Sequence, residues 1–175
     1  DVHVAGFAFE AASARIDHSG GRREGEGRAD LTAVQDGDRD YHLVADYRLA
    51  LDRSEVTLDD VALRFDTTTW RSTRPGIVRW AGSGIEVEHI ELVTARGGRV
   101  FADGTLPDGA PGRLRLELDS VQIGDFAALV QDTLDTRGLV SLDATVTGTT
   151  RAPVLAGRLA VDDLSRAGEP LPALR

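Results

Sequence analysis

Two neighbouring carboxylates have the spacing for acid/base chemistry. Glu86 and Glu88 lie two residues apart in a segment that alternates like a β-strand, so their side chains point to the same side. Strand geometry separates them by about 7 Å, which is within the range of paired catalytic carboxylates. The surrounding sequence offers no aromatic platform for a substrate and no apolar setting that would raise a carboxyl pKa. An exposed acidic strand face is therefore the favoured interpretation.

A second group of carboxylates has the alternate spacing that opens a calcium-binding loop. It consists of Asp36, Asp38 and Asp40. Such a loop also needs a glycine at its sharp turn and a bidentate glutamate at its end, and this chain has Tyr41 and Tyr47 at those positions. A solvated hairpin turn is favoured over a metal site.

The other reactive residue types show no catalytic spacing. Four histidines lack the short separations of metal ligands; they are His3, His18, His42 and His89. Ser83 lies between Gly82 and Gly84 but lacks the outer glycines of a nucleophile elbow. No phosphate-binding glycine loop is present. The sequence thus predicts a protein that is not an enzyme and that binds no metal or cofactor.

Charge and composition exclude several classes of partner. The 175 residues carry a formal charge of -9 without a basic stripe, so nucleic acid is not an expected partner. The same charge disfavours anionic lipid head groups, so any contact with lipid should involve the tails. The chain is 41% hydrophobic, only 5% aromatic, and free of Met and Cys. Aliphatic side chains therefore supply its apolar surface, and no disulfide can form.

Alternation with a period of two dominates the chain and predicts β-strands with one apolar and one polar face. The clearest strand runs from Tyr41 to Leu51, and Val61 to Phe65 and Arg113 to Leu118 alternate in the same way. Further strands are predicted at residues 85–87, 90–94, 99–106, 140–146 and 155–161. Short connections favour a mainly β fold, an antiparallel meander in one segment, residues 1–175, with no linker.

Glycine and aspartate mark the expected turns and irregularities. The pairs Gly97-Gly98 and Asp108-Gly109 are typical of tight turns. Asp103-Gly104 interrupts a strand and predicts a β-bulge, and the apolar phase slips by one residue between Val87 and Ile90, which predicts another.

Two segments depart from the strand pattern. The stretch from Ser19 to Arg28 is rich in glycine and charge, which is typical of a long mobile hairpin tip. One short helix is predicted near residues 125–137, because apolar residues recur there at helical spacing and Gly138 is placed to end it.

The chain is interpreted as an internal piece of a longer protein. It begins without Met and with a strand-like pattern at Val2 and Val4. Residues Asp1 to Glu10 lack the basic-then-apolar order of a signal peptide, and no run approaches the roughly 18 apolar residues of a membrane-spanning helix. A membrane anchor and a targeting signal are expected outside this segment.

Two stretches carry a resemblance to a known family. The first runs from Leu63 to Gly104 and places Trp70 after a strand, then Pro75, then a glycine-turned hairpin at Gly97-Gly98. The second runs from Gly138 to Leu159 and has the order of glycine, apolar strand, Gly-Thr, Pro and a second apolar strand. Together they cover about residues 60 to 162, and their order is similar to that of the TamB family within the AsmA-like group.

The resemblance implies a long antiparallel sheet curled into an open groove, or half-pipe, whose apolar lining passes phospholipid between membranes. It further implies a protein anchored in the inner membrane and crossing the periplasm, with a TamA or BamA type outer-membrane barrel as partner. An older role of such proteins, in the assembly of outer-membrane proteins, comes with the same resemblance.

The predicted lining consists of apolar residues from the clearest strands, which would contact phospholipid acyl chains. They are Leu43, Tyr47, Leu49, Leu63, Phe65, Leu114, Leu116, Leu118, Leu142 and Val146. For each of them, packing in a closed core is an equally good interpretation. Two other functions stay open: a structural or chaperone-like module that binds outer-membrane strands by β-augmentation, and a carbohydrate-active or carbohydrate-binding sandwich favoured by the pair Glu86 and Glu88.

Overall fold

The structure is a computed structural model, and it describes residues 2–4, 7–21, 23–35, 38–124, 136–166 and 169–170. Nearly all of these residues form antiparallel β-strands, which confirms the predicted mainly β class. The strands are β1 (Val2–Val4), β2 (Phe7–Phe9), β3 (Ala11–Gly20), β4 (Gly25–Gln35), β5 (Arg39–Leu49), β6 (Ser54–Phe65), β7 (Thr68–Ser72), β8 (Gly76–Ala81), β9 (Gly84–Thr94), β10 (Arg99–Pro107), β11 (Gly112–Gln122), β12 (Thr136–Gly148), β13 (Pro153–Arg166) and β14 (Glu169–Pro170).

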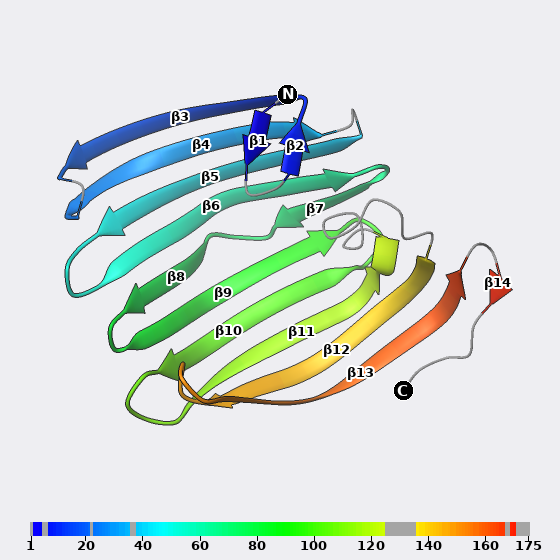
Figure 1. The fold of residues 1–175 in the computed structure, drawn as a ribbon. Helices are drawn as coiled ribbons and strands as arrows, with labels where there is room; N and C mark the ends of the chain where they lie inside the picture. The colour runs from blue at the N-terminus through cyan, green and yellow to red at the C-terminus, as the bar shows by residue number, and fades with distance from the viewer. Residues whose placement is uncertain are drawn as a thin grey trace.

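Twelve strands form one sheet in which sequence neighbours pair in order from β3 to β14, so the predicted meander is confirmed (Figure 1). One strand position is shared. Strands β7 and β8 both lie between β6 and β9, β7 at one end and β8 at the other. Pro75 lies between these two short strands, and because it has no N–H it could not donate a hydrogen bond within a strand ladder. Strands β1 and β2 form a separate two-stranded hairpin.

The two predicted bulges turn out to be one feature of the β9–β10 pair. The register shifts between Ala102 and Gly104, opposite the segment where the apolar phase slips. His89 has a φ of 51° and Gly104 a φ of 131° at this point. A Cβ on Gly104 would lie 2.2 Å from the carbonyl oxygen of Arg113, so this position requires glycine. The bulge keeps the apolar residues of β9 on one face along its whole length.

The predictions for the two irregular segments fare differently. The prediction of a long mobile hairpin tip from Ser19 to Arg28 is wrong, because β3 reaches Gly20 and β4 starts at Gly25. The backbone N–H of Gly21 donates to the carbonyl of Glu24 over 2.6 Å, which closes a tight connection. The predicted helix lies mostly outside the described residues, and its last two positions, 136 and 137, belong to β12.

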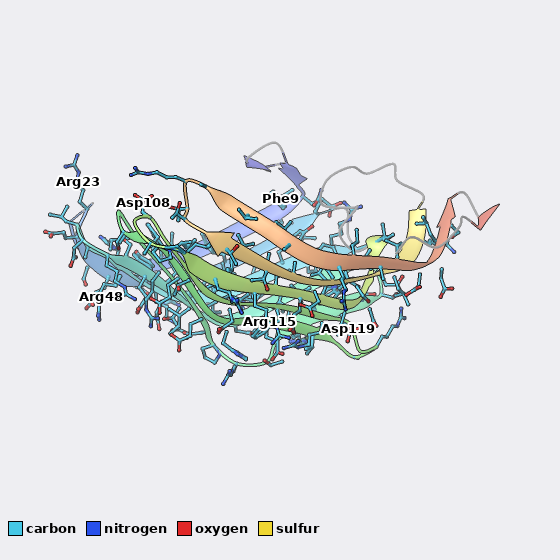
Figure 2. All side chains as sticks on the ribbon, turned by 90° about the horizontal axis from the view of Figure 1, so that it is seen from below. Phe9, Arg23, Arg48, Asp108, Arg115 and Asp119 are labelled. Atoms are coloured by element: carbon cyan, nitrogen blue, oxygen red, sulfur yellow. The ribbon has the colours of Figure 1, made fainter. Side chains whose placement is uncertain are left out.

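The sheet has two chemically different faces, because cross-strand partners share a face and alternate residues change face. The apolar face carries Leu43, Leu63, Leu116 and Leu142, whereas the charged face carries residues such as Arg79. Figure 2 views the molecule from below: Arg48, Arg115 and Asp119 project from the lower side of the sheet, and Phe9 lies on the other side with the β1–β2 hairpin.

The hairpin lies over part of the apolar face, where the Phe9 ring meets Tyr41 edge-on at a centroid distance of 6.1 Å. The sheet is bowed, with the hairpin on its hollow side (Figure 2). This bow is the curvature that a half-pipe needs, and its closure into a groove remains a prediction.

Candidate functional site

All ten residues predicted to line a groove lie on the apolar face. The register aligns Tyr47 with Val56, Leu63 with Tyr41, and Leu114 with Val146, so these apolar side chains form rows that cross the strands. Nine of the ten are half-buried, and Phe65 is buried with 4% of its surface exposed. The structure therefore brings these residues to one continuous surface, although they come from four strands.

One row crosses the sheet from β13 to β3 and contains no charged residue. From β13 to β3 it consists of Leu159, Leu142, Leu118, Val100, Leu92, Ser72, Val61, Leu43, Leu31 and Ala14. Ser72 is the only polar member, and its hydroxyl accepts a hydrogen bond from the backbone N–H of Val61 over 3.0 Å. An aliphatic path thus runs at right angles to the strands.

A large part of the apolar face is open to solvent. Five large side chains on it are exposed, namely Ile16, Trp80, Ile85, Leu155 and Leu159. An open hollow of about 770 Å³ lies over Leu118, Leu142 and Leu159. Gly157, also at this hollow, aligns with Ala144, and a Cβ there would lie 2.7 Å from the Cβ of Ala144. Soluble proteins rarely leave a contiguous apolar surface uncovered without a ligand or partner for it.

One end of the apolar face, around Trp70, forms the core of the described residues. Phe65, Trp70 and Val121 are buried together, and Trp70 is only 1% exposed. Tyr41, Leu63, Leu92, Val100 and Leu118 pack around them. Phe65 therefore supports the sheet and offers no open surface. The apolar face therefore has a packed end around Trp70 and an open end at Trp80 and Ile85. A second exposed region, at Leu155 and Leu159, lies at the edge strand β13.

Tyr47 marks a third environment, where the apolar face meets polar residues. Its ring stacks on His18 at 5.8 Å between centroids, and its hydroxyl hydrogen-bonds to Nδ1 of His18 over 3.0 Å. Gly27 lies beneath the ring, where a Cβ would come within 2.5 Å of the hydroxyl. The adjoining hollow of about 550 Å³ is lined largely by charged side chains. Tyr47 therefore has a polar neighbourhood that the aliphatic lining residues lack.

The charged face is held by ion pairs between neighbouring strands. Arg79 contacts three carboxylates, with Nε 2.5 Å from Glu55 and Nη1 2.7 Å from Glu88 and 3.5 Å from Glu86. The hydrogen bonds to Glu55 and Glu88 raise the pKa of Arg79 above its ordinary range. Arg99 joins Glu91 and Glu117 in the same manner. Each of these two arginines is therefore neutralised by carboxylates on the two neighbouring strands.

A further arginine on this face joins strands β4, β5 and β6. Nη1 of Arg28 lies 2.8 Å from Asp46 and 2.6 Å from Asp59. The hydrogen bonds to these two carboxylates raise the pKa of Arg28. Sequence reasoning had grouped Arg28 with a mobile loop, and the acidic partners are more than fifteen residues away along the chain, so no local pattern indicates this site.

The candidate catalytic and metal-binding residues are engaged elsewhere. Glu86 and Glu88 share the guanidinium of Arg79, and Glu86 also pairs with Arg53 at 2.5 Å. Asp40 pairs with Arg64, and Asp36 lies outside the described residues. Within the described part of the chain, no group of three or more His, Cys, Asp or Glu residues could hold a metal ion. The carboxylates thus serve as partners of arginines.

Among the described residues, no helix has the length and apolar character to span a membrane. Comparison of the chain with protein-family models, curated proteins and solved structures gave no match.

Sequence reasoning missed several residues of the open surface. Ile85 and Leu155 lie within predicted strands and are in phase with the apolar residues beside them, so their signal was present. Ile16 is harder to find, because it is an isolated large apolar residue in a strand of small or polar neighbours. Trp80 follows the adjacent apolar residues Ile77 and Val78, so alternation does not assign it to a face. Only the pairing of those strands with apolar neighbours shows which face they join.

Proposed function

We propose that this chain holds or conducts phospholipid acyl chains on the open part of its apolar face. The observation that carries the proposal is the row without charged residues that runs across the strands from exposed Leu159 on β13 to β3. Hydrocarbon tails suit this surface because it offers apolar contact along a path and few polar groups that would fix one ligand in one orientation.

The expected free energy of binding between an acyl chain and the apolar face is small enough to allow transport. Burying roughly 150 Å² of acyl chain contributes a few kcal/mol at about 25 cal/mol per Å². A tail held this weakly dissociates readily and can move to an adjacent position on the row. A deep pocket with directional hydrogen bonds would retain one ligand, whereas repeated aliphatic positions favour movement.

The charged face supports the same proposal in another way. Its carboxylates and guanidiniums pair across strands, so this side of the sheet presents paired charges to water. The net charge of -9 disfavours attraction to anionic head groups, which leaves the tails as the favoured point of contact.

The resemblance to the TamB family extends the proposal beyond this segment. In that setting the chain is one piece of a periplasmic protein whose anchor in the inner membrane lies elsewhere. Phospholipid would pass along the apolar face between the inner and outer membranes, and a TamA or BamA type barrel would receive the protein at the outer membrane.

The test uses native mass spectrometry and lipid extraction of the chain purified gently from bacteria. The wild-type chain should carry phospholipid. Leu159→Asp places a charge on the apolar face at a side chain that is 53% exposed, so the sheet should stay folded while lipid is lost.

The matched control is Val154→Asp on the same strand. Val154 is 60% exposed and aligns with Thr147 on the charged face, so this variant should keep its lipid. A wild-type chain without lipid, or equal lipid in both variants, would contradict the proposal.

A second candidate function is peptide binding by β-augmentation, and the free edge of β3 favours it. All ten residues of β3 are exposed, and within the described chain only β4 pairs with this strand. An extended peptide could add there through main-chain hydrogen bonds. Binding of extended outer-membrane strand peptides, unaffected by Leu159→Asp, would favour this function over lipid binding.

A further inference from the structure

Strand β3 is an edge that lacks three usual protections against pairing, namely a bulge, a proline and a short length. It runs for ten residues, and its register against β4 continues without a bulge from Ala11 to Gly20. It contains no proline, and every side chain on it is exposed. Native sheets commonly protect such edges with bulges, prolines or short strands, because unpaired backbone groups bind other strands.

The opposite edge of the sheet, at β13, is different. It starts at Pro153, which has no N–H to donate, and its register shifts near Asp163, where φ is 54°. Its last residues, Ser165 and Arg166, already pair with β14. A regular strand therefore fits β3 better than β13.

The charges on β3 would match those of a second copy of β3 that runs in the opposite direction. Arg15 and Asp17 flank Ile16, and their side chains are 84% and 77% exposed. If a second β3 lies antiparallel with Ile16 opposite Ile16, then Arg15 of each copy lies opposite Asp17 of the other. Ser13 lies opposite Ser19 in the same alignment, so the polar face also matches.

The same charges exclude the neighbouring alignments. A shift that keeps the two faces in register moves the pairing by two residues and sets Arg15 opposite Arg15 in one direction or Asp17 opposite Asp17 in the other. Parallel pairing in register opposes like charges at both positions. Directly opposed like charges destabilise a strand pair, so among these alignments only the antiparallel pair centred on Ile16 sets opposite charges against each other.

We propose that β3 is a self-association edge, and that two copies of this chain join there in an antiparallel pair centred on Ile16. Ile16 aligns with Ala29 on the apolar face of its own sheet. The apolar faces of the two copies thus continue into each other across the twofold axis. The inference does not depend on lipid binding, because edge pairing and charge complementarity alone carry it.

The test is a charge exchange followed by sedimentation equilibrium of the whole chain at low salt. Arg15→Asp alone places two carboxylates against each other at both ends of the contact, and Asp17→Arg alone does the same with two guanidiniums. Each variant should raise the dimer dissociation constant roughly ten- to thirty-fold. An equal mixture of the two variants restores opposite charges and should form a heterodimer close to wild-type strength.

Two further measurements separate β3 from other contacts. Arg158→Asp changes an exposed arginine on β13 and should leave the dissociation constant unchanged. Because the chain has no cysteine, Ile16→Cys introduces a single thiol, and mild oxidation should link two copies while Val154→Cys links far fewer.

The result that supports the inference is weakening by each single variant and recovery in the mixture. A wild-type chain that stays monomeric up to about 1 mM would overturn it. So would an unchanged dissociation constant in both β3 variants, or a loss of dimer caused by Arg158→Asp.

Discussion

The two faces of the sheet differ in how their side chains interact with water. On the charged face, long side chains reach across strands, and Arg79 alone contacts Glu55, Glu86 and Glu88. On the apolar face, cross-strand neighbours are aliphatic, and side chains such as Leu159 remain exposed. The comparison teaches that one face can be stable in water through paired charges while the other is left available for hydrocarbon.

The apolar face itself contains a second contrast, between its two tryptophans. Trp70 is 1% exposed and belongs to the buried cluster, whereas Trp80 is 41% exposed. The side chains at the packed end hold the sheet together, and those at the open end contribute less to its stability. Substitutions at both ends can therefore test whether stability and binding are separated on this face.

The largest effect is expected at the packed end. Trp70→Ala removes the largest buried side chain and should lower the free energy of unfolding by about 3–5 kcal/mol, because the cavity cannot refill. Trp80→Ala, the matched variant at the open end, should cost about 1 kcal/mol. Urea unfolding followed by circular dichroism measures both. Equal losses would mean that the open end is part of the core.

A smaller effect is expected on the charged face. Arg79→Gln leaves three carboxylates without their shared cation, and because the Arg79 side chain is only 19% exposed, the free energy of unfolding should fall by about 2 kcal/mol. Arg48→Gln removes a pair to Glu26 from a side chain that is 71% exposed and should cost less than about 0.5 kcal/mol. Urea unfolding measures both losses. If the Arg79 ion pairs contributed nothing, the two variants would have the same urea midpoint.

The smallest effect depends on pH. A hydrogen bond from the Thr73 hydroxyl, followed by one from Arg99, lowers the pKa of Glu91 below its ordinary value of 4.5. A lowered folded pKa stabilises the protein above the unfolded value, and this stability is lost as pH falls through the folded pKa. Glu91→Gln should cost about 1 kcal/mol at neutral pH.

The pH profile supplies its own control. The difference between wild type and Glu91→Gln should shrink steadily below about pH 4.5 and disappear once the carboxyl of Glu91 is protonated. A difference that is constant from pH 7 to pH 3 would show that the glutamate acts through its shape and not through its charge.

Much of the fold follows from periodicity. Strict alternation at Arg113 to Leu118 predicts one strand and the face of its apolar residues. Less strict alternation predicts a strand from Tyr41 to Leu51, and in the structure this strand ends at Leu49. The slip of phase between Val87 and Ile90 correctly indicates a bulge. These signals are strong because alternate large apolar and charged residues leave only one orientation with the apolar set together.

Other parts were not predictable from local pattern. Strands β3 and β4 are rich in Ala, Gly and charge, so their alternation is weak and resembles a loop. The register shift between Leu118 and Val121 depends on Ser120, which adopts a φ of 50° without a glycine to indicate it. The exposure of Leu159 could not be predicted from the sequence either, because alternation assigns a residue to a face but does not show whether that face is covered.

The central claim is that hydrocarbon contacts the apolar face and not the charged face. The most direct measurement is paramagnetic broadening of Leu and Val methyl signals by a phospholipid that carries a nitroxide on its acyl chain. Leu114, Leu142 and Leu159 should broaden, whereas Val93 and Val154, which lie on the charged face, should not. Equal broadening on both faces, or broadening confined to Val93 and Val154, would contradict the account.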